Sequence, residues 1–206
     1  MRGLRRGEQF QRGLGRLALC EKCNRKTAVW YGDAFASWTQ QGFEVLSRAK
    51  GIWIESAAFL IKPSRVIKQA SLLMIAQSHP QMHRNNWYRD LCTKLLSPTA
   101  SGRPHDFRVL LYMLRSRARM SGMAGSISTR TGNSTVVYAE VALPPFGYCF
   151  MPDETATEAL VTEFRMADIT RFFDFGLDQA SNEFLNFPIL TPDGIAPLHY
   201  RDGTSQ

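Results

Sequence analysis

The sequence predicts an α+β fold in which about three helices precede a mainly antiparallel β-sheet. Apolar residues recur at helical spacing through roughly the first 100 residues, whereas from Phe107 onward they alternate or form continuous runs between Gly-, Asn- and Thr-rich turns. The chain has 206 residues, of which 44% are hydrophobic, and this is enough for one substantial core. We therefore expect a flexible basic arm over residues 1–16, a short module over 17–35 and an α+β domain over 36–206.

The helical part is predicted from periodicity and from end signals. Asp33 is a candidate N-cap for a first helix. Residues 51–61 begin with strand formers, and Pro63 then opens a second helix that His79-Pro80 ends. A third helix is expected from Asn86 to Leu96. The apolar face of the first helix comprises Phe35, Trp38, Gly42, Val45 and Leu46, and one side of the second comprises Val66, Ile67, Ala70, Leu73, Met74 and Gln77.

Strand patterns fill the second half of the chain. The segments 107–114, 119–129 and 135–151 read as sheet strands, with the turn "RTGNST" between the last two. Three later segments, 168–175, 184–190 and 197–203, contain short apolar runs, and the last two also contain Pro188 and Pro197. This pattern favours short strands or extended segments, some of them edge strands. The architecture expected is a partial zinc knuckle, helices and then a sheet.

Charge divides the chain into a basic and an acidic part. Residues 1–120 carry 21 Lys and Arg against 7 Asp and Glu, a balance of +14, whereas residues 121–206 carry 4 against 11, a balance of −7. The basic part predicts a polyanionic partner, of which nucleic acid is the commonest in the cytosol. The alternative is a solvated basic face that the acidic half neutralises within the fold.

Location and cofactors are constrained by what the sequence lacks. There is no run of 18 or more apolar residues and no apolar signal region near the first residue, so we expect a cytoplasmic protein without membrane contact. Four cysteines fit a reducing compartment better than a disulfide framework. The Gly-rich "GMAGS" has no P-loop lysine, and no small-molecule cofactor is expected.

Cys20 and Cys23 form a Cys-x-x-Cys pair, which is the sharpest chemical signal in the chain. Two thiolates at this spacing can hold one Zn²⁺ ion, although a tetrahedral site needs four ligands. Free cysteines are one alternative. A thioredoxin-like redox pair is another, and the missing βαβ context argues against it.

The residues after this pair, Asn24, Arg25 and Lys26, together with the preceding "GLGRLAL", resemble the C-terminal half of the HNH endonuclease motif. The resemblance implies that Cys20 and Cys23 are zinc ligands and that Asn24 is the last residue of the catalytic H-N-H triad. It also implies DNA as substrate, contacts from Arg25 and Lys26, and Mg²⁺ or another divalent ion at the phosphate. Stretches such as "PSRVIKQ", "PPFGYCF" and "HYRDG" extend the likeness to poorly known prokaryotic proteins that begin with an HNH-like module.

The chain departs from the HNH pattern before Cys20. Residues 1–19 contain no Cys, His or Asp, so the upstream Cys-x-x-Cys and the Asp/Glu-His of the motif are missing. The sequence therefore predicts a nuclease-family protein that is inactive as written, through a start codon placed too far downstream or through decay. The alternative is a non-catalytic module that binds nucleic acid or a protein.

Other residues offer weaker sites. His79, His83 and Cys92 could complete the metal site, but they fit a helix end, a loop and a core position as well. Cys149 is expected in the core.

Three arginines occupy alternate positions just after residue 114, which would place them on one face of a strand. They could contact successive phosphates of a nucleic acid, or instead face the acidic half of the chain. They are Arg115, Arg117 and Arg119. Segment 83–91 mixes cations and aromatic rings in the manner of a nucleic-acid surface or of a helix start packed on the core. Asp168, Arg171 and Asp174 could form a local salt-bridge set.

Overall fold

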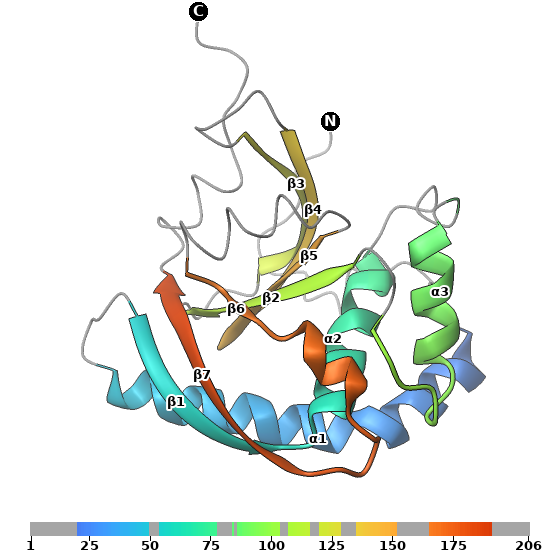
Figure 1. Ribbon diagram of the computed structural model, residues 1–206, viewed down its shortest axis with the longest axis horizontal. Coiled ribbons are helices and arrows are strands. Elements are labelled where there is room, and N and C mark those ends of the chain that lie inside the picture. Colours follow the sequence, from blue (N-terminus) through green and yellow to red (C-terminus); the bar gives the residue numbers. More distant parts are fainter. Residues whose placement is uncertain are drawn as a thin grey trace, which may run out of the picture.

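The helices and strands form an α+β fold around one mixed, mostly antiparallel sheet (Figure 1). The computed structural model describes residues 20–49, 54–77, 84, 86–103, 107–115, 120–128, 135–151 and 165–190. Its sheet has the strand order β1-β7-β2-β5-β4-β3, and the two-residue strand β6 pairs with β2 beside this path. The predicted fold class is confirmed.

Helix α1 (Glu21–Arg48) is one continuous rod of 28 residues. The prediction that a helix starts at Asp33 is wrong, because Gly32 and Asp33 lie inside α1 and the N-cap is Cys20. The helix also runs without a break through residues 35 and 36, where we expected a domain boundary. Its predicted apolar face is correct, since Trp38 and Gly42 are buried and Phe35, Val45 and Leu46 pack against the core.

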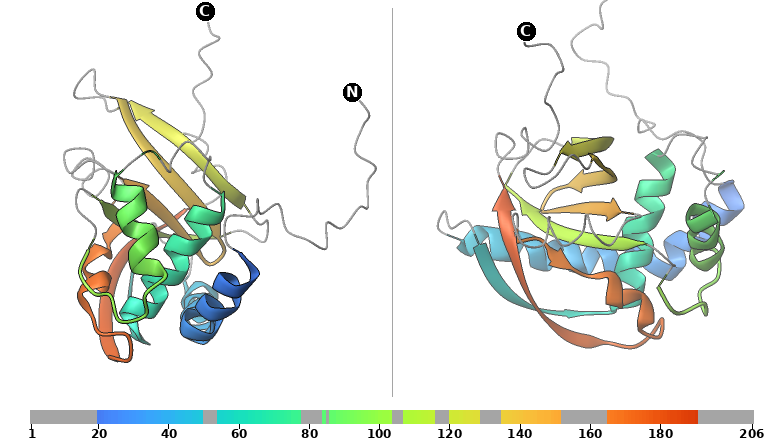
Figure 2. Two further views of the ribbon diagram at one scale, coloured as in Figure 1. Left: turned by 90° about the vertical axis from the view of Figure 1, so that its right-hand side faces the viewer. Right: turned by 45° about the horizontal axis from the view of Figure 1, so that its top comes forward.

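Three further elements lie close to the residue ranges predicted for them. They are β1 (Ile54–Ile61), α2 (Pro63–Gln77) and α3 (Asn86–Leu95). On the predicted face of α2, Val66, Ile67, Ala70 and Met74 are buried and Leu73 is half-buried, while the burial of Gln77 is not described. His79, Pro80, His83 and His105 lie outside the described residues. Figure 2 shows the three helices grouped together, with β3 and β4 extending beyond them.

The central strands are β2 (Arg108–Leu114), β3 (Met120–Ser128), β4 (Thr135–Leu143) and β5 (Phe146–Met151). β4 and β5 form a tight hairpin, and β5 pairs antiparallel with β2. β7 (Ser181–Leu190) links this group to β1, because it pairs antiparallel with β1 along its length and parallel with the end of β2.

Segment 168–175, where we expected a short strand or an extended segment, is mostly helical. Ala167–Asp168 form the short strand β6, and Thr170–Asp174 then form a 3₁₀ helix, η2. The adjacent Phe172 and Phe173 are both buried, and a helical turn can bury two adjacent residues whereas an edge strand would send them to opposite faces. The expected strand at 184–190 is confirmed as part of β7, and the segment 197–203 lies outside the described residues.

Aromatic side chains fill the core where α1, β1 and β5 meet. The rings of Trp38 and Phe146 stack with centroids 4.3 Å apart, and Phe59 lies 4.6 Å from Trp38. All three side chains are buried. This packing holds the middle of α1 against the sheet and leaves the first turns of the helix outside the core.

A buried lysine ties α2 to the chain that follows α3. Lys68 is 1% exposed, and its ammonium donates to the carbonyl oxygens of Ser97 at 3.1 Å, Pro98 at 3.3 Å and Ala100 at 2.7 Å. Three N–H donors thus meet three acceptors, as a buried charge requires. Burial lowers the pKa of Lys68 from 10.5 to about 8.

Candidate functional site

The first turn of α1 brings the two cysteines of the motif together. Cys20 is the N-cap, with extended backbone angles, and its Sγ accepts a hydrogen bond from the backbone N–H of Cys23 at 3.3 Å. The acceptor at an N-cap is usually a side-chain oxygen of Ser, Thr, Asp or Asn. The Cys20 side chain is exposed and that of Cys23 is half-buried.

The two thiols differ in acidity because they hydrogen-bond with each other. The side-chain hydrogen bond with Cys23, followed by its backbone N–H, lowers the pKa of Cys20. The same side-chain hydrogen bond raises the pKa of Cys23. Cys20 is therefore the thiol of the pair that ionises first.

A zinc site needs more ligands than this turn provides. Two thiols on one turn suit two of the four tetrahedral positions. The described part of the chain contains no group of three or more His, Cys, Asp and Glu side chains able to hold a metal ion. Cys92, half-buried in α3, and Cys149, buried in β5, therefore do not join the pair. The four histidines lie outside the described residues.

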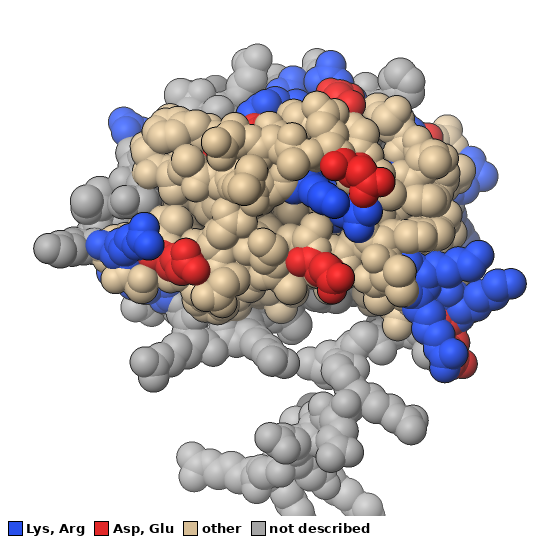
Figure 3. Space-filling view, turned by 90° about the horizontal axis from the view of Figure 1, so that it is seen from below, with Lys and Arg blue, Asp and Glu red and all other residues tan. Residues whose placement is uncertain are grey.

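Three cations of α1 lie beside the cysteines and form what we call the basic face: Lys22, Arg25 and Lys26. Their spacing of three and four residues places them on one side of the helix. All three are exposed, and Arg25 donates to Glu21 at 2.5 Å in an equally exposed ion pair. Val29, one turn further on, is 77% exposed. Figure 3 shows Lys and Arg side chains gathered at the right-hand end, where α1 begins.

Asn24, which the motif assigns to catalysis, is also exposed on this first turn. Its backbone N–H donates to the carbonyl oxygen of Cys20 at 2.9 Å, which starts the helical hydrogen-bond ladder. Asn24, Arg25 and Lys26 thus share the start of α1 with both cysteines, because they are consecutive in the sequence.

Arg115, the first of the three predicted arginines, lies far from the cysteine pair. Arg115 is exposed just after β2 ends, and its guanidinium donates to the carbonyl oxygen of Ala49 at 2.7 Å, at the C-terminal end of α1. At 1.5 Å per residue, Ala49 lies about 36 Å along the helix from Arg25. Arg117 and Arg119 lie outside the described residues. The predicted strand face of three arginines is therefore wrong for Arg115, which follows the strand.

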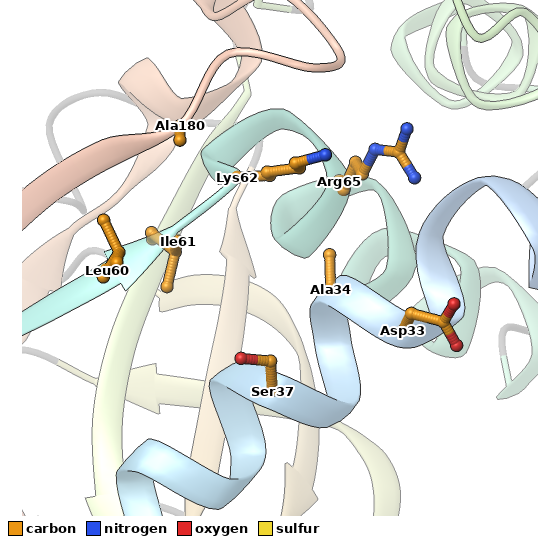
Figure 4. Close-up of a pocket in the computed structure, with 8 residues that line it drawn as sticks. All are labelled: Asp33, Ala34, Ser37, Leu60, Ile61, Lys62, Arg65 and Ala180. Carbon is orange, nitrogen blue, oxygen red and sulfur yellow. The ribbon is translucent and has the colours of Figure 1, made fainter.

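A pocket of about 380 Å³ opens between α1, the end of β1 and the start of α2 (Figure 4). Lys62 and Arg65 line it, and both contact Asp178, at 3.6 Å and 2.5 Å. The hydrogen bond from Arg65 lowers the pKa of Asp178, so this carboxylate already partners both cations. No sequence pattern predicts this pocket, because its walls come from separate segments. Its lining also includes Asp33, Ala34, Ser37, Leu60, Ile61 and Ala180.

The outer face of β1 and β7 exposes two large apolar side chains, Leu60 and Phe184, each 66% exposed. β1 is the end strand of the sheet. The Gln41 side chain pairs with its edge: Nε2 donates to the carbonyl oxygen of Leu60, and the N–H of Leu60 donates to Oε1, both at 3.0 Å. The side-chain amide of Gln41 thus makes the two hydrogen bonds that one residue of a further strand would make with the edge of β1.

The remaining predicted residues have structural roles. Tyr88 and Leu91 are buried and Trp87 packs against the core, which favours the helix interpretation of segment 83–91. The predicted salt-bridge set within 168–174 is wrong. Arg171 pairs with Glu183 of β7 and Asp168 pairs with Arg108 of β2.

Comparison with protein-family models, with curated proteins and with solved structures finds no match. In the described parts of the chain, no helix combines the length and apolar character needed to cross a membrane.

Proposed function

We propose that this protein binds nucleic acid, with DNA as the first candidate, through the basic face of α1. The supporting observation is that Lys22, Arg25 and Lys26 lie exposed on one side of the helix start, next to the motif that resembles HNH proteins. A helix is also the element that fits the major groove of DNA.

Three electrostatic contributions favour a polyanion here. The basic face carries three positive charges against the single carboxylate of Glu21, which pairs with Arg25, and the helix dipole adds a partial positive charge at the same end. In the sequence, residues 1–16 add five arginines against one glutamate. Phosphate contacts of this kind give affinity without sequence preference.

Binding is proposed without cleavage. Phosphodiester hydrolysis by an HNH-type site needs a base near an attacking water and a metal ion at the phosphate. The start of α1 offers Asn24 and two thiols, and residues 1–19 contain no His, Cys or Asp that could supply the rest of the motif. A zinc ion at Cys20 and Cys23 remains a prediction that requires two further ligands.

The test is fluorescence anisotropy with a labelled DNA duplex across a series of salt concentrations. A variant with Lys22→Gln, Arg25→Gln and Lys26→Gln removes the basic face. The matched control is Arg48→Gln, Arg89→Gln and Arg103→Gln, which removes the same charge from other exposed positions. Each lost phosphate contact reduces the slope of log affinity against log salt by about 0.9, so we expect a reduction of about 2 to 3.

The control variant should keep most of the wild-type slope. Equal losses in both variants would show that net charge alone attracts DNA, and would contradict a site on α1. Absence of binding at low salt would overturn the proposed function itself.

A further inference from the structure

The geometry of the Cys20–Cys23 pair supports chemistry that needs no additional ligand. The two residues occupy the N-cap and the third helical position, which lie on the same side of a first turn. Cys20 Sγ accepts a hydrogen bond from the backbone N–H of Cys23 at 3.3 Å, so the sulfur of Cys20 contacts the backbone of Cys23. An exposed thiol next to a less exposed one is the arrangement of an attacking and a resolving cysteine.

We propose that Cys20 and Cys23 are a reversible dithiol–disulfide pair that exchanges with external disulfides such as oxidised glutathione. In the first step, the Cys20 thiolate attacks one sulfur of the external disulfide. A mixed disulfide forms, and the other half leaves as a thiolate that takes a proton from solvent.

In the second step, Cys23 loses its proton and attacks the Cys20 sulfur of the mixed disulfide. The Cys20–Cys23 disulfide forms, and the second half of the external disulfide leaves as a thiol. Overall, two protein thiols are oxidised and one external disulfide is reduced to two thiols. The reverse reaction consumes two external thiols.

The other two cysteines provide an internal comparison. Cys149 is 1% exposed within β5, and Cys92 is half-buried in α3 and packs against the core. An external disulfide must reach the attacking sulfur, so access favours Cys20 over both. The basic residues Lys22, Arg25 and Lys26 also surround the pair and attract an anionic disulfide such as oxidised glutathione.

The experiment equilibrates the full-length, metal-free protein in buffers with graded ratios of reduced to oxidised glutathione. Acid quenching, alkylation of the remaining thiols and peptide mass mapping then identify the state of each cysteine. We expect the Cys20–Cys23 peptide to lose two hydrogen atoms and escape alkylation as the buffer becomes oxidising, while the Cys92 and Cys149 peptides stay alkylated. Added dithiothreitol should reverse the change.

Two variants separate the steps. Cys23→Ser should stop at a mixed disulfide between glutathione and Cys20, since the resolving thiol is absent. Cys20→Ser should leave Cys23 largely unmodified under the same conditions. Far-UV circular dichroism checks that both variants remain folded.

Three results would overturn the proposal. One is glutathione on both cysteines of the wild type without a bond between them. Another is oxidation of Cys92 or Cys149 at the same ratio as the pair. The third is tight binding of one zinc ion per chain that protects both thiols from exchange in the protein as purified, which would assign the pair to a metal site. None of these results depends on DNA binding.

Discussion

The indole Nε1 of Trp38 donates a hydrogen bond of 2.8 Å to the phenol oxygen of Tyr148, and both side chains are fully buried. The two residues belong to α1 and β5, so this bond fixes the helix against the sheet at a single point. Burial raises the pKa of the Tyr148 hydroxyl, which therefore stays neutral.

Replacing Tyr148 by Phe should leave the Trp38 N–H buried without its acceptor. We expect the free energy of unfolding to fall by about 1–3 kcal/mol, measured by urea denaturation. Combining it with Trp38→Phe removes both partners, and the double mutant should lose less than the sum of the two single losses. Strict additivity would contradict a direct energetic link between the two residues.

Two glycines of α1 should respond in opposite directions to alanine. A Cβ on Gly42 would lie 2.5 Å from the Phe146 ring and 2.7 Å from Pro145, whereas a Cβ on Gly32 meets no atom within 4 Å. We expect Gly42→Ala to lower the melting temperature, because overpacking costs about 1–3 kcal/mol. Gly32→Ala should raise it, since alanine is favoured over glycine in a helix by about 1 kcal/mol. A melting temperature raised by both would show that the Phe146 ring moves aside freely.

Lys68 should make stability depend on pH between about 8 and 10.5. Its pKa is about 8 in the folded protein against 10.5 as the reference value. Within this interval the unfolded chain holds the proton that the folded chain has released, so the unfolding free energy rises with pH. Below pH 8 the gain in unfolding free energy is absent, because Lys68 is protonated in both the folded and the unfolded chain.

The measurement compares wild type with Lys68→Met, which lacks the titrating ammonium group. The titrations of the other residues are shared by both proteins and largely cancel in the difference. The difference in unfolding free energy, wild type minus variant, should grow as pH increases from 8 to 10. A difference that stays constant or shrinks would show that the three carbonyl bonds keep the folded-state pKa near 10.5.

Gln41 should protect the edge of the sheet. Gln41→Ala removes both hydrogen bonds to Leu60, and exposes its N–H and C=O next to an apolar side chain that is 66% exposed. Unpaired edges of this kind pair with other chains. We expect concentration-dependent self-association by analytical ultracentrifugation, which the added substitution Leu60→Lys should suppress. A variant that stays in the same association state as wild type would contradict a protective role.

Local patterns predicted most of the fold and little of the site geometry. The second and third helices were found because their apolar faces repeat every three to four residues and end at clear signals. The start of α1 was missed because Gly32-Asp33 resembles a helix boundary, while burial of Tyr31 and Trp38 on either side outweighs the local cost of glycine.

Long-range partners could not be predicted from spacing. Arg171 pairs with Glu183, and Arg65 with Asp178, 113 residues away. Residues Cys20 to Lys26 lie together because they occupy the N-cap and the first two turns of α1. Their role depends on ligands or partners that the motif alone does not contain.

The pairing of β1 with β7 has a consequence for the newly made chain. Ile61 at the end of β1 lies opposite Ser181, about 120 residues later in the sequence. At roughly 5 to 20 residues per second, a ribosome needs about 6 to 24 s to synthesise that interval. During this time Phe59 has emerged, while Phe187 of β7, whose ring lies 5.9 Å from that of Phe59, does not yet exist. Nascent chains of this protein are therefore expected to bind a chaperone before synthesis ends. At this stage Gln41 has already been synthesised and can hydrogen-bond with Leu60 of β1.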